Sequence, residues 1–252
     1  MKKIPRKRTS GSGTQPRRPP RFSRELAILY EDDAVVAVNK PAGLLAVPAP
    51  DSDAPSALSL LLQDLKPRGQ RALVVHRIDR FASGVLLFAK TMRDRDALVR
   101  QFLAHTPVRQ YLAVVRGNIA AKEGILVHYF RREGMYQILS TDRDRKAARA
   151  ELKYSVERTF RAASLLRVEL LTGLQNQIRV QFAALGHPVI GDRKYSSDEA
   201  SEHRIARVAL HAASLEFIHP RSRETVSLEC DLPTDFRSLL KALSPPPPRG
   251  QR

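Results

Sequence analysis

The sequence predicts an α+β fold in which helices pack on a mixed, mostly antiparallel sheet. Segments with strand patterns outnumber helical ones, short turns join many of them, and no regular alternation of strand and helix runs along the chain. With 252 residues and 42% hydrophobic content, the chain can bury one large core. We expect this core within residues 22–243, between two polar ends.

Apolar runs and alternating segments between turn signals mark the expected strands. These strands are predicted at 34–38, 85–89, 111–115, 125–129, 152–156, 164–171, 207–210, 214–218 and 225–229. Apolar residues at helical spacing predict helices over 56–65, after Thr91, after Thr172 and over 236–243. Thr91 and Thr172 each stand three residues before Asp94 or Gln175, which is the spacing of a capping box. The polar segment 141–146 is expected to form a solvated loop.

Two basic residues fall at positions that a site could use. Lys40 lies in an Asn-Lys-Pro-Ala-Gly turn cluster, which would place it at the rim of the sheet. In the third predicted helix, Ile178, Phe182 and Leu185 are spaced to form a buried stripe. Arg179 lies about 100° around the axis from Ile178, so it can reach inward from the edge of that stripe.

The charge of the chain indicates a polyanionic partner. The net charge is +17 and the sequence pI is about 10.6, which together favour RNA binding. Residues 1–24 hold nine Lys or Arg and no acid, which leaves +8 for the rest of the chain. We expect residues 1–21 to form a disordered basic arm that attracts phosphates, or alternatively a simple solubility tail. The proline-rich residues 244–252 should form a second disordered end.

Several classes of chemistry are not indicated by the sequence. Cys230 is the single cysteine, and the seven histidines lack the spacing of a metal site. There is no glycine-rich phosphate loop, so we expect no metal and no nucleotide cofactor. Neither a membrane-length apolar run nor a secretory leader is apparent, and we expect a cytoplasmic monomer. A catalyst, if present, must be built from side chains.

The segment 76–84, His-Arg-Ile-Asp-Arg-Phe-Ala-Ser-Gly, is the most informative part of the chain. It places Asp79 between Arg77 and Arg80, directly before the buried strand expected at 85–89. A carboxylate in a cleft loses several kcal/mol of hydration, and an arginine at about 4 Å returns roughly 4 kcal/mol at an effective dielectric near 20. Asp79 therefore needs a cationic partner. Either it is a reactive carboxylate held in a rigid position beside the core, or it belongs to a structural ion pair.

This segment resembles the His-Arg-Leu-Asp-Arg-x-Thr-Ser-Gly element of the RluA-like RNA pseudouridine synthases. Further motifs of that family have counterparts, in the same order, at 39–43, 109–113, 171–192 and 210–220. The resemblance covers roughly residues 25–222. It implies a mixed sheet with a central active-site cleft, a uridine in rRNA or tRNA as substrate, and neither cofactor nor metal.

The resemblance also implies roles for individual residues. Asp79 would be the nucleophile, Arg179 its ionic partner, and Tyr111 the ring that stacks on the uracil and serves the proton step at C5. Taken alone, Tyr111 could equally be a half-buried strand aromatic. The candidate substrate contacts are Arg77, Arg80, Lys40, Asn176 and Leu210. Among these, Lys40 could be an ordinary turn lysine, and we interpret His76 and His211 as structural.

The chain departs from the family pattern beside the expected pocket. Leu174-Gln175-Asn176 stands where the family usually has Arg-Thr-His, Ala82 replaces a threonine, and Val47 replaces a frequent histidine. These changes spare the nucleophile and affect substrate recognition. The leading hypothesis is an RNA pseudouridine synthase, and the alternative is a non-catalytic RNA-binding or RNA-folding factor on the same scaffold.

Overall fold

The structure, a computed structural model, describes residues 26–50, 53–134, 136–196 and 205–244. Its centre is an eleven-stranded sheet with the strand order β1-β2-β4-β10-β5-β9-β8-β6-β7, to which β3 adds beside β4 and β11 beside β10. The strands are β1 (Ala27–Glu31), β2 (Val35–Lys40), β3 (Leu73–Val74), β4 (Ser83–Ala89), β5 (Val108–Arg116), β6 (Glu123–Glu133), β7 (Tyr136–Ser140), β8 (Ala148–Thr159), β9 (Ala163–Leu170), β10 (Leu210–Ile218) and β11 (Thr225–Glu229).

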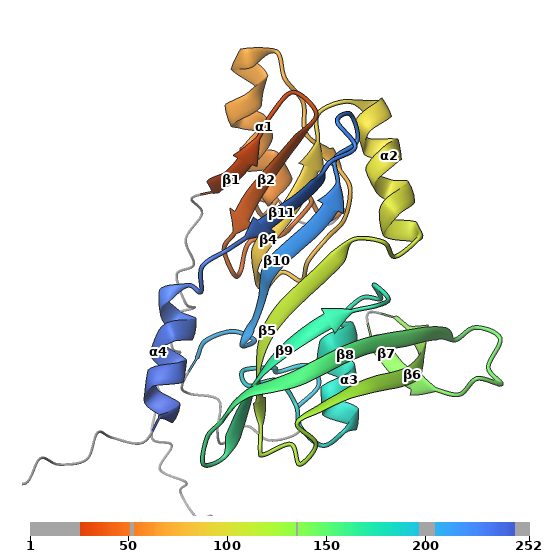
Figure 1. The fold of residues 1–252 in the computed structure, drawn as a ribbon, viewed down its shortest axis with the longest axis vertical. Helices are drawn as coiled ribbons and strands as arrows, with labels where there is room; N and C mark the ends of the chain where they lie inside the picture. Colours follow the sequence, from red (N-terminus) through yellow and green to blue (C-terminus); the bar gives the residue numbers. More distant parts are fainter. Residues whose placement is uncertain (1–25, 51–52, 135, 197–204, 245–252) are drawn as a thin grey trace, which may run out of the picture.

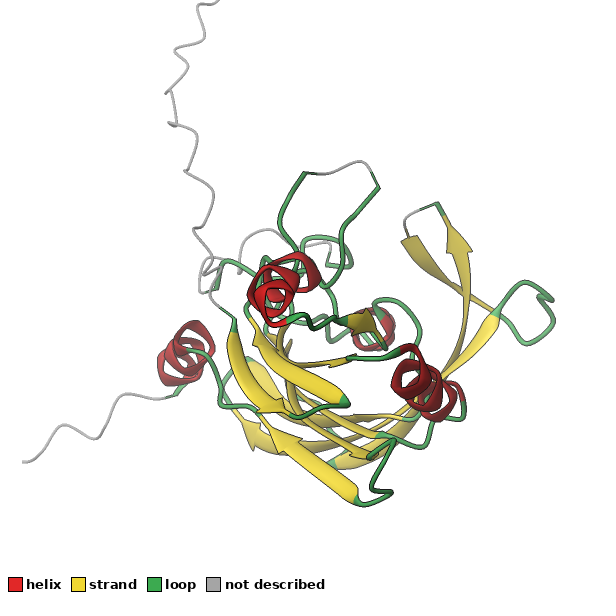
Figure 2. Ribbon diagram, turned by 90° about the horizontal axis from the view of Figure 1, so that it is seen from above, coloured by secondary structure: helices red, strands yellow, loops and turns green. Residues whose placement is uncertain are grey.

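The sheet is mixed but mostly antiparallel, as predicted. Of its pairings, only that of β10 with β4 is parallel, within the part of the chain that the structure describes. The helices are α1 (Ala57–Leu65), α2 (Met92–Leu103), α3 (Gln177–Ala184) and α4 (Thr234–Leu243), with a short 3₁₀ turn, η1 (Lys66–Arg68), after α1. Figure 1 shows α1 and α2 beside the half of the sheet that contains β2 and β4, and α3 beside β8 and β9. Figure 2 shows how strongly the sheet curves.

The two halves of the sheet meet where β10 lies between β4 and β5. The first residues of β4 pair with His211 and Ala212, and Gly84 in this pairing has a φ of +113°. A Cβ at Gly84 would lie 2.1 Å from the carbonyl oxygen of Ala212. His211 is fully buried and strengthens this junction, because its ring nitrogens lie 2.9 Å from the Ser83 hydroxyl and 3.0 Å from the Cys230 carbonyl.

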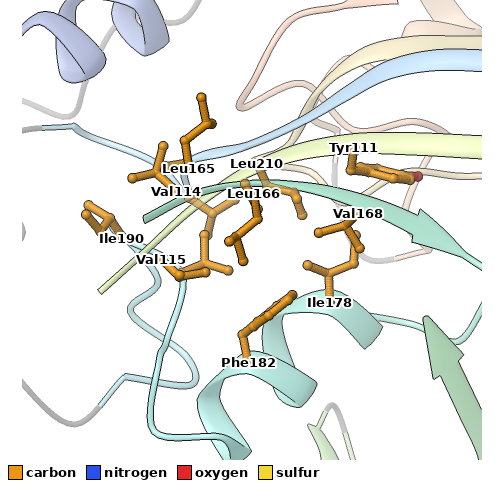
Figure 3. Packing of buried hydrophobic residues seen from close by; sticks show 14 of the residues in the cluster. Tyr111, Val114, Val115, Leu165, Leu166, Val168, Ile178, Phe182, Ile190 and Leu210 are labelled. Atoms are coloured by element: carbon orange, nitrogen blue, oxygen red, sulfur yellow. The ribbon is translucent and has the colours of Figure 1, made fainter. Parts of the chain in front are cut away.

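The largest core lies under the second half of the sheet and carries α3. Ile178 points from α3 toward Val168 of the sheet, and Phe182 extends from the same helix into the same apolar cluster (Figure 3). The Phe182 ring also meets Tyr154 edge-on, with 5.7 Å between ring centroids. Burying each of these large side chains contributes about 1.5–3 kcal/mol, so α3 is held firmly where Arg179 leaves it.

Helix starts were predicted with mixed success. Thr91 caps α2 by accepting a hydrogen bond from the Asp94 backbone, as predicted. The capping box at Thr172 is wrong, because the Thr172 hydroxyl bonds the backbone of Glu151 and α3 begins only at Gln177. Leu185 is also wrong as a core residue, since it is 42% exposed beyond the end of α3.

Some strand boundaries also differ from the prediction. Only the last residue of the expected strand 207–210 is in a strand, because Leu210 N–H turns back to the Val208 carbonyl at 2.8 Å. The strands β1, β3 and β7 were not predicted, since they are short or have a weak apolar pattern. The basic arm and the proline-rich tail lie outside the described residues, apart from Ser244.

Two features are absent from the described residues. None of their helices is long and apolar enough to cross a membrane. Within the same residues, His, Cys, Asp and Glu side chains form no group of three or more that could hold a metal ion.

The close approach of β4 and β10 predicts that adding one methyl group at Gly84 destabilises the protein. Gly84→Ala should lower the free energy of unfolding by more than about 4 kcal/mol, because the new Cβ has no space and the backbone angle is unfavourable. Gly69→Ala is the matched control: Gly69 also has positive φ, but its Cβ would meet nothing within 4 Å. That control should lose about 1–2 kcal/mol. Equal losses in urea denaturation would contradict this account of the junction.

Candidate active site

A cavity of about 1130 Å³ opens beside the junction of the two sheet halves. Its walls come from the 45–50 loop, the 75–82 loop, the end of α2, β5 and the 173–179 turn. All but one of the residues expected at the site from the sequence line this cavity. These are Arg77, Asp79, Arg80, Tyr111, Asn176, Arg179 and Leu210.

Asp79 lies in the loop between β3 and β4, with its side chain 20% exposed to the cavity. Buried Ile78 anchors the loop on one side, and the Ala82 N–H closes a turn on the Asp79 carbonyl at 3.1 Å. Arg179 supplies the partner that the carboxylate requires, since its Nη1 lies 3.1 Å from Asp79 Oδ2. The expected ion pair therefore forms, although 100 residues separate its members.

Arg179 is held from several sides at once. Its Nε and Nη2 donate to the two oxygens of Asp192 at 2.7 and 2.8 Å, and its Nη1 donates to Asn176 Oδ1 at 2.7 Å. Burial alone would lower the pKa of Arg179, but the hydrogen bonds and charges of Asp192 and Asp79 outweigh burial and raise that pKa. The guanidinium is therefore a permanent cation with a fixed orientation.

Asp192 is the site residue that the sequence analysis did not identify. It is fully buried and, besides Arg179, its Oδ1 accepts the backbone N–H groups of Lys194 at 2.8 Å and Tyr195 at 3.1 Å. The sequence feature that could have indicated it is the acidic residue of the Gly191-Asp192 pair, at the end of the 171–192 motif. Nothing in the local pattern indicates which cation it binds.

Tyr111 projects from β5 into the wall of the cavity and is 8% exposed. Burial raises the pKa of Tyr111 to about 12, against the opposing charge of Arg109. The phenol is therefore neutral near pH 7, and its ring can stack on a base. Leu210, 4% exposed at the start of β10, adds an apolar wall to the same cavity.

Asn176 lies at the start of α3 in a left-handed conformation, with φ of 57°. Its Oδ1 faces Arg179, and its Nδ2 donates to the Tyr195 hydroxyl at 3.2 Å. Both ends of the amide are thus engaged by protein groups. Asn176 lines the cavity, but its observed contacts orient Arg179.

Arg77 and Arg80 are exposed at the cavity. The Arg80 Nε donates to the Gly43 carbonyl at 3.0 Å, and its guanidinium lies 5.4 Å from the centre of the Phe81 ring. Neither arginine makes the ion pair with Asp79 that their sequence neighbourhood suggests, within the described residues. Both side chains are therefore exposed where the cavity opens.

Lys40 is not at the rim of the sheet, contrary to the prediction. It is fully buried at the end of β2, and it is absent from the described residues that line the cavity. Its ammonium donates to the carbonyls of Pro41 at 2.8 Å, Leu44 at 2.9 Å and Arg80 at 3.1 Å. Lys40 therefore fixes the backbone at Arg80, the residue next to Asp79.

His76 has the structural role expected for it. Burial lowers the pKa of His76 to about 3, so the ring is neutral and its Nε2 accepts the Leu87 N–H at 3.1 Å. The ring also stacks on Phe102, with 4.6 Å between centroids. These contacts attach the 75–82 loop to β4 and α2.

The position of Lys40 predicts a loss of stability rather than of RNA affinity. Lys40→Met leaves three carbonyl oxygens without their donor and should lower the free energy of unfolding by about 2–4 kcal/mol. Lys153→Met, at a lysine whose side chain is 53% exposed, should change it by less than about 0.5 kcal/mol. Urea denaturation and RNA titration of both variants check this. Full stability of Lys40→Met with weakened RNA binding would instead make Lys40 a substrate contact.

Comparisons with known proteins identify the family of the chain. The sequence model of the family described as RNA pseudouridylate synthase matches residues 34–184. Ribosomal large subunit pseudouridine synthase D of Nitrosomonas europaea is 36% identical over 227 aligned residues, covering 86% of this chain and 65% of that protein. Dual-specificity RNA pseudouridine synthase RluA of Vibrio vulnificus is 34% identical, covering 84% of this chain and 86% of that protein.

A solved structure shows the same fold. Human RNA pseudouridylate synthase domain containing 4 superposes with a TM-score of 0.71 at 22% identity, covering 86% of this chain and 92% of that one. The family match extends over more than half of the chain, and the curated relatives exceed 30% identity across most of it. These findings confirm the family, the enzyme class and the α+β fold that the sequence predicts. The chain belongs to the RNA pseudouridylate synthase family.

Proposed function

We propose that this protein converts a specific uridine of structured RNA into pseudouridine, with Asp79 as the nucleophile. The observation that carries the proposal is a carboxylate at the wall of a cavity, ion-paired at 3.1 Å to a buried arginine. Ribosomal RNA is the favoured substrate because the curated relative with 36% identity is named for the large ribosomal subunit. Transfer RNA is the second candidate.

The reaction needs one nucleophile and no external reactant. The C1′–N1 bond of uridine breaks, the base rotates, and a C1′–C5 bond forms as the C5 proton leaves and N1 gains a proton. Asp79 can attack C1′ and expel the uracil as an anion, or add to C6 and push the electron pair into the ring. In both routes the negative charge of Asp79 moves to the base, and the carboxylate is restored at the end.

The neighbouring residues bind the base, transfer the C5 proton and contact phosphates. Tyr111 offers a face for the uracil, and its hydroxyl serves the transfer of the C5 proton. Flipping a base out of a helix costs a few kcal/mol, and one aromatic stack returns about 1–3 kcal/mol. Stacking alone therefore leaves no surplus, so phosphate contacts from Arg77, Arg80 and the strongly basic surface must supply the affinity.

The departures at 174–176 affect recognition in this account. The family histidine is replaced by Asn176, whose amide oxygen is hydrogen-bonded to Arg179. Leu174 and Gln175 line the cavity and carry no charge. They are therefore the residues to vary when the sequence preference for the target RNA is studied.

Asp79→Asn separates the enzyme from a non-catalytic RNA-binding factor. An amide is a poor nucleophile, so pseudouridine formation should fall below detection, while RNA affinity should stay within about three-fold because phosphate contacts dominate it. Pseudouridines are mapped in RNA from cells that lack the gene and from cells that carry Asp79→Asn. The same missing modification in both supports the proposal. Unaltered modification in the deletion strain would refute the proposal. If Asp79→Asn fully restored the modification that the deletion strain lacks, an RNA-folding factor would be favoured.

Tyr111 can be dissected into its ring and its hydroxyl. Tyr111→Phe keeps the stacking face, so kcat should fall by about 100-fold or more through the proton step while the Kd for RNA is unchanged. Tyr111→Ala should also weaken binding by about 1–3 kcal/mol. Single-turnover rates and filter binding measure the two effects. A Tyr111→Phe variant with the wild-type rate would remove the hydroxyl from the mechanism.

A further inference from the structure

Asp192 forms a second, hidden ion pair behind the catalytic one. Its carboxylate holds Arg179 through two hydrogen bonds of 2.7 and 2.8 Å, whereas Asp79 receives one of 3.1 Å. Asp192 is fully buried, and it is absent from the described residues that line the cavity. It therefore cannot touch a bound nucleotide directly.

The backbone around Asp192 is fixed independently of Arg179. Its Oδ1 accepts the N–H groups of Lys194 and Tyr195, and the preceding Gly191 has φ of +78°. A Cβ at Gly191 would lie 1.9 Å from the carbonyl oxygen of Arg207, so the turn is closely packed. Asp192 is thus held rigidly in place before any substrate binds.

Three groups compete for one guanidinium in this arrangement. Asp192 takes Nε and Nη2, while Asp79 and Asn176 share Nη1. The shorter contacts belong to the hidden carboxylate and the amide. Asp79 therefore has the weakest hydrogen bond to Arg179 of the three. This suits a carboxylate that must give its electron pair to the substrate.

We propose that Asp192 is a positioning residue that keeps Arg179 oriented and charge-compensated while Asp79 reacts. The inference rests on the proposed function, in which an electron pair passes from Asp79 to the uracil. At that moment Arg179 would lose the counter-charge of Asp79, and a buried cation without a partner is costly. Asp192 prevents this cost because its charge does not change during the reaction.

The same residue keeps Asp79 reactive before the bond forms. Without Asp192, the full attraction of Arg179 would fall on Asp79, stabilising the carboxylate and making its electron pair less available. The guanidinium would also be free to turn. Both effects raise the barrier of the chemical step and leave the binding of RNA unchanged, since Asp192 does not reach the cavity.

Asn176 offers a way to test charge separately from shape. Its Oδ1 already contacts Arg179, so Asn176→Asp places a carboxylate on the same guanidinium from another direction. The Tyr195 hydroxyl, 3.2 Å from Asn176 Nδ2, can then donate to the new oxygen. The double variant Asp192→Asn with Asn176→Asp therefore keeps a second carboxylate on Arg179, at position 176 instead of position 192.

The matched control is Asp94 of α2. Asp94 is 2% exposed and accepts two hydrogen bonds from Arg221, at 3.1 and 2.8 Å, outside the residues that line the cavity. Asp94→Asn thus removes a buried carboxylate that is bound to an arginine by two hydrogen bonds, as Asp192 is, but in an ion pair outside the site. It should lower the melting temperature and leave kcat unchanged.

The experiment measures kcat, KM and melting temperature with ribosomal RNA from cells that lack the gene. Asp192→Asn should lower kcat by about 10- to 100-fold with KM within about three-fold, the range for a lost group that orients a reacting residue. The double variant should regain at least about ten-fold of that loss. If Asp192→Asn does not fold, a folded double variant with kcat within about ten-fold of wild type supports the proposal alone.

Three outcomes would overturn the inference. These are a folded Asp192→Asn variant with the wild-type kcat, a loss that appears in KM alone, and a folded double variant that regains no activity. A purely structural role would give the last of these, because Asn176→Asp does not repair the turn at 192. Wild-type protein that forms no pseudouridine would refute the proposed function itself, and with it this inference.

Discussion

The ion pair between Asp79 and Arg179 is the constraint on which the site depends. Asp79 comes from the loop before β4, in one half of the sheet, and Arg179 comes from α3, which packs under the other half. Asp79, partly buried at the wall of the cavity, needs a cationic partner, and Arg179 supplies it at 3.1 Å. The pair therefore requires that both halves be held together accurately, and the parallel contact of β4 with β10 does this.

The polar groups around this pair are arranged to leave little freedom. Lys40 donates to three backbone carbonyls beside the Asp79 loop, and His211 of β10 links Ser83 of β4 to Cys230 just after β11. Asp192 holds the Arg179 guanidinium on the side away from the cavity. Each of these buried groups has hydrogen-bond partners, so displacing any one of them would leave buried polar atoms unpaired. The result is a rigid carboxylate facing a cavity, in a protein of high positive charge.

The sequence predicted those features that follow from local pattern or from ordered motifs. The buried strand after Asp79, the Thr91 cap and the stripe of Ile178 and Phe182 follow from apolar spacing, and the structure confirms them. The pairing of Asp79 with Arg179 came from the family resemblance, because the residues alone indicate only that a partner is needed.

Other features depend on tertiary contacts that no local pattern encodes. Lys40 is buried because the chain folds the carbonyls of Leu44 and Arg80 over it, and Asn176 adopts a left-handed conformation to face Arg179. Asp192 pairs with Arg179 across a turn whose course is set by the packing of Gly191 on Arg207.

The single-turnover rate of Arg179→Lys tests the central claim most directly. Lysine keeps the charge but cannot bridge Asp79, Asn176 and Asp192 with a planar fork. If a fixed guanidinium orients the nucleophile, the rate of pseudouridine formation should fall by about 100-fold or more, while the Kd for RNA stays within about three-fold. A near wild-type rate, or a loss that lies entirely in RNA affinity, would contradict the account.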